Sequence, residues 1–326
     1  MAGPRFSLRK GEGEGSLLCL AGGDSAGGAH PGGYSSFTQQ AVILSYHLLR
    51  GGSIDRETLA RELAELDGSP DEPSVFRATT GELRRWLDSM GESELTLSAE
   101  PSAEPAARAA PVGLWFRRDP EAAVGAALET ARLTHLDGPT AVAATAAAGA
   151  VAASCFAQHG RDLILAAAEM ASRAAEAIST QDFRYARLES IPDTLDRFWG
   201  AARFNGEPAE AIAAQVGMDP VGSVVAAIVL SAPLSSQPHE LVEEGARIGG
   251  SVVGALMGAM IGARTGVRSW PWDIPNDSWF VALGQRLVAG ESDMADASSG
   301  EARLADLPVP YAVEQRLTYA ADVRPI

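Results

Sequence analysis

The chain has 326 residues, 46% of them hydrophobic, so it can bury a substantial core as one large domain or as two ordinary ones. It carries 26 basic and 42 acidic residues, which give a formal net charge of -16. This negative charge argues against partners that attract basic proteins, namely nucleic acid and anionic membrane surfaces.

Hydrophobic residues recur with helical spacing along most of the chain and alternate as in a strand almost nowhere. Asp55 and Thr80 can accept hydrogen bonds from free N–H groups at a helix start, and four prolines suit a first helical turn. We therefore predict an all-α single domain. Helices are expected over residues 38–49, 55–66, 80–90, 120–134, 140–159, 162–178, 192–202, 208–216, 220–230, 239–263 (with a possible break at 249–250) and 277–287.

One segment, residues 138–160, has no acidic residue and no arginine and is mostly Ala, Val and Thr. It is long enough to span a membrane, which takes about 20 apolar residues. Its small side chains instead favour a central helix buried in a soluble core. The same interpretation applies to residues 254–262, where small residues recur every four positions, a spacing that in lipid would suggest helix dimerisation.

Two stretches are predicted to lie outside the packed helices. Residues 91–111 are rich in Ser, Glu and Pro, which predicts a surface loop. From Gly290 the composition becomes acidic and polar, so we divide the chain into a helical domain over residues 11–290 and an acidic linker with a C-terminal arm over residues 291–326.

The two cysteines, Cys19 and Cys155, lie far apart in apolar surroundings, so free buried thiols are expected rather than a disulfide. The start of the sequence lacks the basic, apolar and small-residue regions of a signal peptide. A cytoplasmic location is therefore the expectation.

Four segments, in order, resemble the ADP-ribosylglycohydrolase family, which includes the glycohydrolase that reactivates dinitrogenase reductase. G-S-L-L-C-L-A-G-G-D-S-A-G from Gly15 resembles the family's opening helix and G-D-A-x-G turn. G-G-Y-S-S-F-T-Q-Q-A from Gly32 resembles its G-x-(Y/W)-T-D-D-T-x-M-A helix start. A-A-R-A-A-P-V-G-L and A-R-L-T-H-L-D-G-P, from Ala106 and Ala131, resemble M-R-A-A-P-V-G-L and L-T-H-x-D-P. A-R-I-G-G with G-A-L-M-G-A, within residues 246–259, resembles the G-G-D-T-D-T helix and the small-residue run after it.

The resemblance covers roughly residues 11–287 and implies the family's orthogonal helical bundle. It also implies hydrolysis of the bond that joins ADP-ribose to a protein side chain, assisted by two magnesium ions. Magnesium prefers octahedral oxygen ligands and is held by carboxylates. In the family these come from the T-D-D start of one helix and the D-x-D-T start of another.

This sequence departs from the family at both helix starts. Ser35 stands in place of the threonine, and Ser36 and Phe37 stand in place of the two aspartates. At the second start, an ungapped match places residues 249–252, Gly-Gly-Ser-Val, on D-T-D-T, and a gapped match deletes the quartet. The loop that carries a catalytic glutamate in the family is shortened to residues 28–32, where His30 is the one titratable side chain. No cofactor, metal site or catalytic residue is therefore expected.

The positions that remain form a degenerate ligand pocket in this interpretation: Ser35, Ser36, Phe37, Thr38, Arg108, His135 and Asp137. Several of these residues have two open interpretations. Arg108 could bind a phosphate through its planar guanidinium or form a buried ion pair. His135 could line the pocket, as the family's histidine does, or be structural.

Three further features are expected to be structural. Asp137 is expected to cap the next helix. Asp24 is expected to bond backbone amides of its own glycine turn. The aromatic residues Trp270, Trp272 and Trp279 could stack on an adenine or pack against the core.

Three functions stay open. The first is a family member that has lost magnesium-dependent hydrolysis and acts by binding or regulation, with ADP-ribose, another nucleotide-like small molecule or a protein as partner. The second is a hydrolase of ADP-ribosyl or related N- or O-glycosidic bonds with relocated or metal-free chemistry at His30, His135 or Asp24, although such cleavage usually needs two facing carboxylates. The third is an assembly subunit whose former cleft is filled by Phe37.

Overall fold

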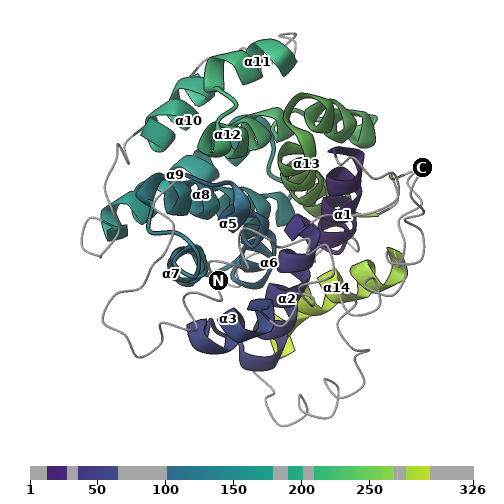
Figure 1. The fold of residues 1–326 in the computed structure, drawn as a ribbon. Helices are drawn as coiled ribbons and strands as arrows, with labels where there is room; N and C mark the ends of the chain where they lie inside the picture. The colour runs from purple at the N-terminus through teal and green to yellow at the C-terminus, as the bar shows by residue number, and fades with distance from the viewer. Residues whose placement is uncertain are drawn as a thin grey trace, which may run out of the picture.

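The computed structural model describes residues 13–27, 36–64, 101–178, 190–200, 209–267, 270 and 277–293. Helices dominate this part of the chain and pack as a bundle of crossing layers (Figure 1), which confirms the all-α prediction. In chain order they are α1 (Gly15–Gly27), α2 (Ser36–Gly51), α3 (Arg56–Ala64), α5 (Glu104–Ala107), α6 (Ala109–Trp115), α7 (Pro120–Ala131), α8 (Gly138–Cys155), α9 (Gly160–Ile178), α10 (Ser190–Gly200), α11 (Ala209–Val216), α12 (Pro220–Ser231), α13 (Pro238–Thr265) and α14 (Asp277–Asp293).

Helix starts follow the local signals in the sequence. Asp119, Asp137 and Asp219 cap α7, α8 and α12, and each accepts a hydrogen bond from a backbone N–H of the first turn. A proline follows each cap within the first turn, where its missing N–H costs no hydrogen bond. The helix predicted over residues 80–90 lies outside the described residues.

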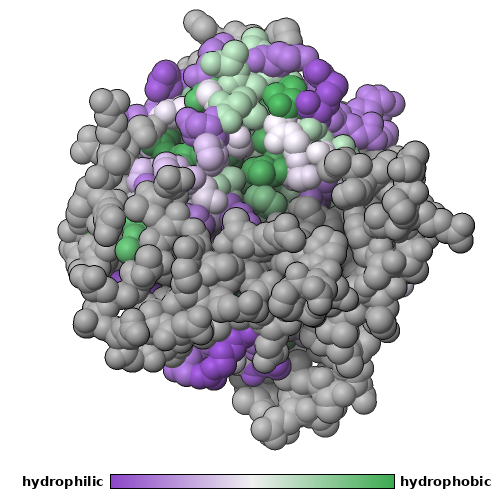
Figure 2. Space-filling model, viewed as in Figure 1, coloured by the Kyte–Doolittle hydropathy of each residue, from purple (hydrophilic) through white to green (hydrophobic). Residues whose placement is uncertain are grey.

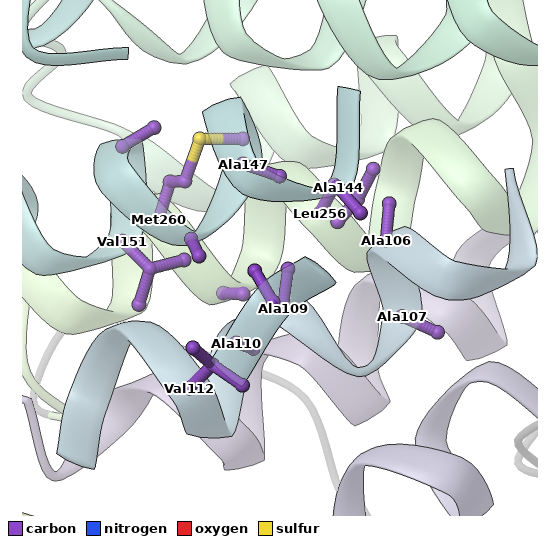
Figure 3. Close-up of a cluster of buried hydrophobic side chains, with 14 of the residues drawn as sticks. Ala106, Ala107, Ala109, Ala110, Val112, Ala144, Ala147, Val151, Leu256 and Met260 are labelled. Carbon is purple, nitrogen blue, oxygen red and sulfur yellow. The ribbon is translucent and has the colours of Figure 1, made fainter. Parts of the chain in front are cut away.

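Residues 103–111 correct the sequence-based prediction of a surface loop. Residues 104–107 form α5, and residues 109–111 begin α6, and both short helices lie in the core. In Figure 3, side chains of α5 and α6 such as Ala106 and Ala109 face Ala144 and Ala147 of α8, with Leu256 and Met260 of α13 close by. Alanines allow this close approach because their side chains end at the Cβ atom.

Helices α1 and α13 form the most extensive helix pair among the described elements, and Figure 1 shows them side by side. They run antiparallel, with backbone facing backbone. A Cβ atom at Gly23 would overlap the backbone of Gly254, and one at Gly258 would overlap the backbone of Cys19. The small-residue run predicted to pack closely in a soluble core is therefore the contact surface for α1.

Helix α8 is buried along nearly its whole length, as predicted. Two described helices are long and apolar enough to cross a membrane by length and composition alone, α8 and α13. Other parts of the protein bury 89% of the apolar window in α8 and 67% of that in α13. Both helices therefore serve here as core helices.

Other sequence-based expectations can be checked on side chains. Cys19 and Cys155 are buried thiols that are not joined in a disulfide, as expected. Trp270 and Trp279 pack against the core, and Trp272 lies outside the described residues. On the face shown in Figure 2, apolar and polar residues intermingle at the top, where Figure 1 places α10 to α12.

Candidate functional site

The end of α1, the start of α2 and the middle of α13 meet at Asp24. One carboxylate oxygen of Asp24 accepts hydrogen bonds from the backbone N–H of Thr38 at 3.2 Å and from the Thr38 hydroxyl at 2.7 Å. The backbone oxygen of Asp24 accepts a bond from the Ser251 hydroxyl at 3.0 Å. Asp24 is only 1% exposed. The expected glycine turn is wrong, because this segment is helical and Asp24 caps the first turn of another helix.

The start of the second half of α13 is set by Gly250. This residue has φ 65° and ψ -159°, a conformation that glycine adopts without a steric penalty, and it interrupts the helix where a break was expected. The chain of α1 approaches so closely that a Cβ atom on Gly27 would overlap the backbone of Gly250 and Ser251. Residues 249–252, which the ungapped match aligns with the second metal-binding helix start of the resembled family, thus lie against the end of α1.

The side chains at the two helix starts do not fit a pair of magnesium ions. Phe37 is 7% exposed and belongs to the core cluster. The carboxylate of Asp24 already accepts two bonds from Thr38. Within the described ranges, no group of three or more His, Cys, Asp or Glu side chains is placed to hold a metal ion. Ser35 and His30 lie outside those ranges, as does the Ser36 side chain.

A second buried polar cluster surrounds Arg108, at the junction of α5 and α6. Its Nη2 donates to the hydroxyl of Thr134 at 2.8 Å, and the same hydroxyl lies 2.8 Å from Nδ1 of His135. Burial lowers the pKa of Arg108 to about 10, although the charge of Glu104 opposes this shift. The alternative of a buried ion pair is not borne out, because Arg108 has no acidic partner within salt-bridge distance among the described residues.

Asp137 begins α8, as predicted. Its carboxylate accepts from the backbone N–H of Thr140 at 2.8 Å and from the Thr140 hydroxyl at 2.6 Å. The Thr140 hydroxyl also accepts from the backbone N–H of Ser102 at 2.9 Å. Asp137 therefore ties the start of α8 to the segment that leads into α5, and it supports the polar cluster without joining it.

The structure brings the predicted pocket residues into two clusters rather than one. Thr38 lies with Asp24 and Ser251, whereas Arg108 lies with Thr134 and His135. Nε2 of Gln40 in α2 donates to Oε1 of Glu104 in α5 at 3.5 Å, a hydrogen bond that joins the two helices. Sequence reasoning missed Glu104, since it lay in the predicted loop, and Gln40 and Thr134, although both stood inside the quoted motifs.

His135 makes stability depend on pH. Burial, followed by the charge of Arg108, lowers the pKa of His135 to about 4, compared with 6.5 for a free histidine. Between pH 6.5 and pH 4 the unfolded chain therefore binds a proton that the folded chain does not bind, and stability falls with falling pH. We expect the free energy of unfolding to decrease by about 2 kcal/mol between pH 7 and pH 5 through this residue.

Urea unfolding at both pH values, with the wild type and His135→Gln, measures this contribution. Between pH 7 and pH 5 the free energy of unfolding should decrease by about 2 kcal/mol less in the variant than in the wild type. His159→Gln, which changes an exposed ring bonded to a backbone carbonyl, is the control and should behave as the wild type. An unchanged pH dependence in His135→Gln would contradict the assignment of a neutral, buried ring.

Comparisons with known proteins agree with the fold. A family model described as ADP-ribosylglycohydrolase matches residues 6–305. A solved structure described as an ADP-ribosylglycohydrolase-related protein complex is 20% identical, with a TM-score of 0.61, over 87% of this chain and 99% of that chain. At this identity, the likeness shows a shared fold. No curated protein matches. Because the family model matches nearly the whole length of the chain, the chain belongs to the ADP-ribosylglycohydrolase family.

Proposed function

We propose that this chain keeps the ligand-binding scaffold of its family and acts by binding or regulation, without magnesium-dependent hydrolysis of protein-linked ADP-ribose. The proposed ligand is ADP-ribose or a similar nucleotide-like small molecule, bound near the start of α2 and the turn that carries His135. A protein partner is the other occupant to test.

The observation that carries this proposal is the burial of Phe37 at the position of the family's second aspartate. Burying a phenylalanine side chain stabilises a fold by roughly 1.5 to 3 kcal/mol. A hydrated magnesium ion gives up water only for comparable oxygen ligands, and neutral hydroxyls and a phenyl ring do not provide them. Phe37 at this helix start therefore stabilises the fold and provides no ligand for a metal ion.

The second candidate, a metal-free hydrolase, is less well supported. A general base works best with a pKa near the working pH, whereas the pKa of His135 is lowered to about 4. The carboxylate of Asp24 is bound to the first turn of α2 and is 1% exposed. Neither group is arranged to activate water.

Calorimetry with magnesium and with ADP-ribose tests the proposal. We expect no magnesium binding in the micromolar range and ADP-ribose binding of equal strength with magnesium or with a chelator. A ligand that binds only the folded chain, present at a concentration 100 times its dissociation constant, stabilises the folded chain by about 2.7 kcal/mol. Melting curves therefore give an independent measurement of binding.

The activity assay measures release of ADP-ribose from a modified protein, with magnesium and with chelator. No release is expected in either condition. Release that requires magnesium, or micromolar magnesium binding, would overturn the proposal. Release that survives the chelator would support the metal-free hydrolase, and absence of any ADP-ribose binding would favour an assembly subunit.

A further inference from the structure

The guanidinium of Arg108 is buried with most of its hydrogen-bonding capacity unused. Arg108 is 0% exposed, yet its Nε and Nη1 have no hydrogen-bond partner, and its Nη2 donates to a neutral hydroxyl. Burying a charge is costly unless hydrogen bonds and an opposite charge compensate it. The side chain therefore retains two donors that an acceptor of negative charge would satisfy.

The hydrogen bonds around Thr134 add a third donor. An arginine can only donate, so the Thr134 oxygen accepts from Arg108, and its hydroxyl proton can donate to Nδ1 of His135. This direction leaves the proton of the neutral imidazole on Nε2. The cluster thus offers three donor nitrogens, Nε and Nη1 of Arg108 and Nε2 of His135.

The nearby acidic groups do not fill these donors. Glu104 acts on Arg108 through its charge but is not within salt-bridge distance, and Asp137 is engaged by Thr140. A second arginine, Arg264, shows that unbonded nitrogens alone do not define a site. Its Nε and Nη1 also lack partners, but its Nη2 donates to the Pro233 carbonyl just beyond α12, where the helix end carries partial negative charge.

We propose that Arg108, together with His135, binds an oxyanion of the ligand, a phosphate or a carboxylate. This inference rests on the proposed function, since it names the charged group that the scaffold would recognise. Nη2 has a second N–H besides the one given to Thr134, and together with Nε or with Nη1 it forms a planar fork that matches two oxygens of such a group. Because Arg108 is fully covered, the oxyanion enters on the side of His135, which keeps 5% exposure, and the residues over the guanidinium rearrange.

Calorimetry with inorganic phosphate, acetate, ADP-ribose and adenosine tests the inference on the whole chain. Arg108→Gln removes the charge, and it should weaken phosphate and ADP-ribose binding roughly 10- to 100-fold while adenosine binding stays the same. Arg264→Gln is the matched control, since it removes a similarly unbonded arginine elsewhere and should leave every affinity unchanged. Comparing phosphate with acetate identifies which oxyanion the cluster prefers.

The outcomes separate this inference from the proposed function. ADP-ribose bound equally by the wild type and Arg108→Gln overturns the inference and leaves the proposed function standing. Phosphate bound only when Arg108 is present, without any ADP-ribose binding, supports the inference and overturns the nucleotide ligand. If Arg108→Gln does not fold, Thr134→Val keeps the charge but breaks the link to His135, and unchanged phosphate affinity in that variant would overturn the paired site.

Discussion

Replacing Gly258 with alanine is expected to lower the free energy of unfolding by about 3 kcal/mol. The added Cβ atom would overlap the backbone oxygen and carbon of Cys19 in α1. A flexible side chain could turn away, but a backbone carbonyl inside a helix cannot move without displacing the whole helix. The cost is therefore at the upper end for a substitution that adds one methyl group.

Urea unfolding of Gly258→Ala beside Gly125→Ala measures this effect. Gly125 lies inside α7, and a Cβ atom there would meet nothing within 4 Å. Alanine at that position should stabilise the protein by about 0.5 to 1 kcal/mol, because it lowers the entropy lost by the backbone on folding. If Gly258→Ala and Gly125→Ala lowered the free energy of unfolding by the same amount, contact between the helices would not be the cause.

Removing the carboxylate of Asp24 is the second substitution expected to have a large effect. Asp24→Ala should cost about 3 kcal/mol, because a hydrogen bond to a charged group contributes about 1.5 to 3 kcal/mol and a lost acceptor leaves buried donors unsatisfied. Both donors belong to Thr38. The start of α2 should then loosen, together with the neighbouring candidate pocket.

Asp119→Ala is the matched control, since Asp119 caps α7 at an exposed position by accepting from the backbone N–H of Ala122. Loss of an ordinary cap costs about 1 kcal/mol. Hydrogen exchange should show faster exchange in the first turns of α2 for Asp24→Ala only. Similar losses of stability for the two variants would mean that Asp24 acts as a local cap and does not join α1 to α2.

Much of the helical pattern could be predicted, because the signals that start these helices are local. Pro120 and Pro220 both fall at observed helix starts. Helices α5 and α6 were missed for a physical reason: they have 4 and 7 residues, too few for a periodic pattern, and they follow a Ser-, Glu- and Pro-rich stretch that is typical of loops. Tertiary packing against α8 decides their burial.

The candidate site was less predictable, because its contacts join residues far apart in the chain. Arg108 and His135 were predicted as pocket positions alongside the family resemblance, but the hydroxyl of Thr134 that they share depends on the turn after α7. Asp24 was assigned to a local turn, since a single sequence does not show that the start of α2 packs against the end of α1. Interactions that are local in the sequence can be predicted from residue types. Contacts between distant segments can be identified only once the packing of the helices is known.

The contact between α1 and α13 has a consequence for the proposed pocket. The two helices meet at four pairs of positions: Gly15 with Gly262, Cys19 with Gly258, Gly23 with Gly254 and Gly27 with Gly250. Moving four residues forward along α1 therefore corresponds to moving four residues back along α13. A slide by a single residue would set alanine and valine side chains against carbonyl groups. The register of the two helices therefore fixes the distance between Asp24 and Ser251. A ligand cannot widen this end of the proposed pocket by shifting one helix along its axis.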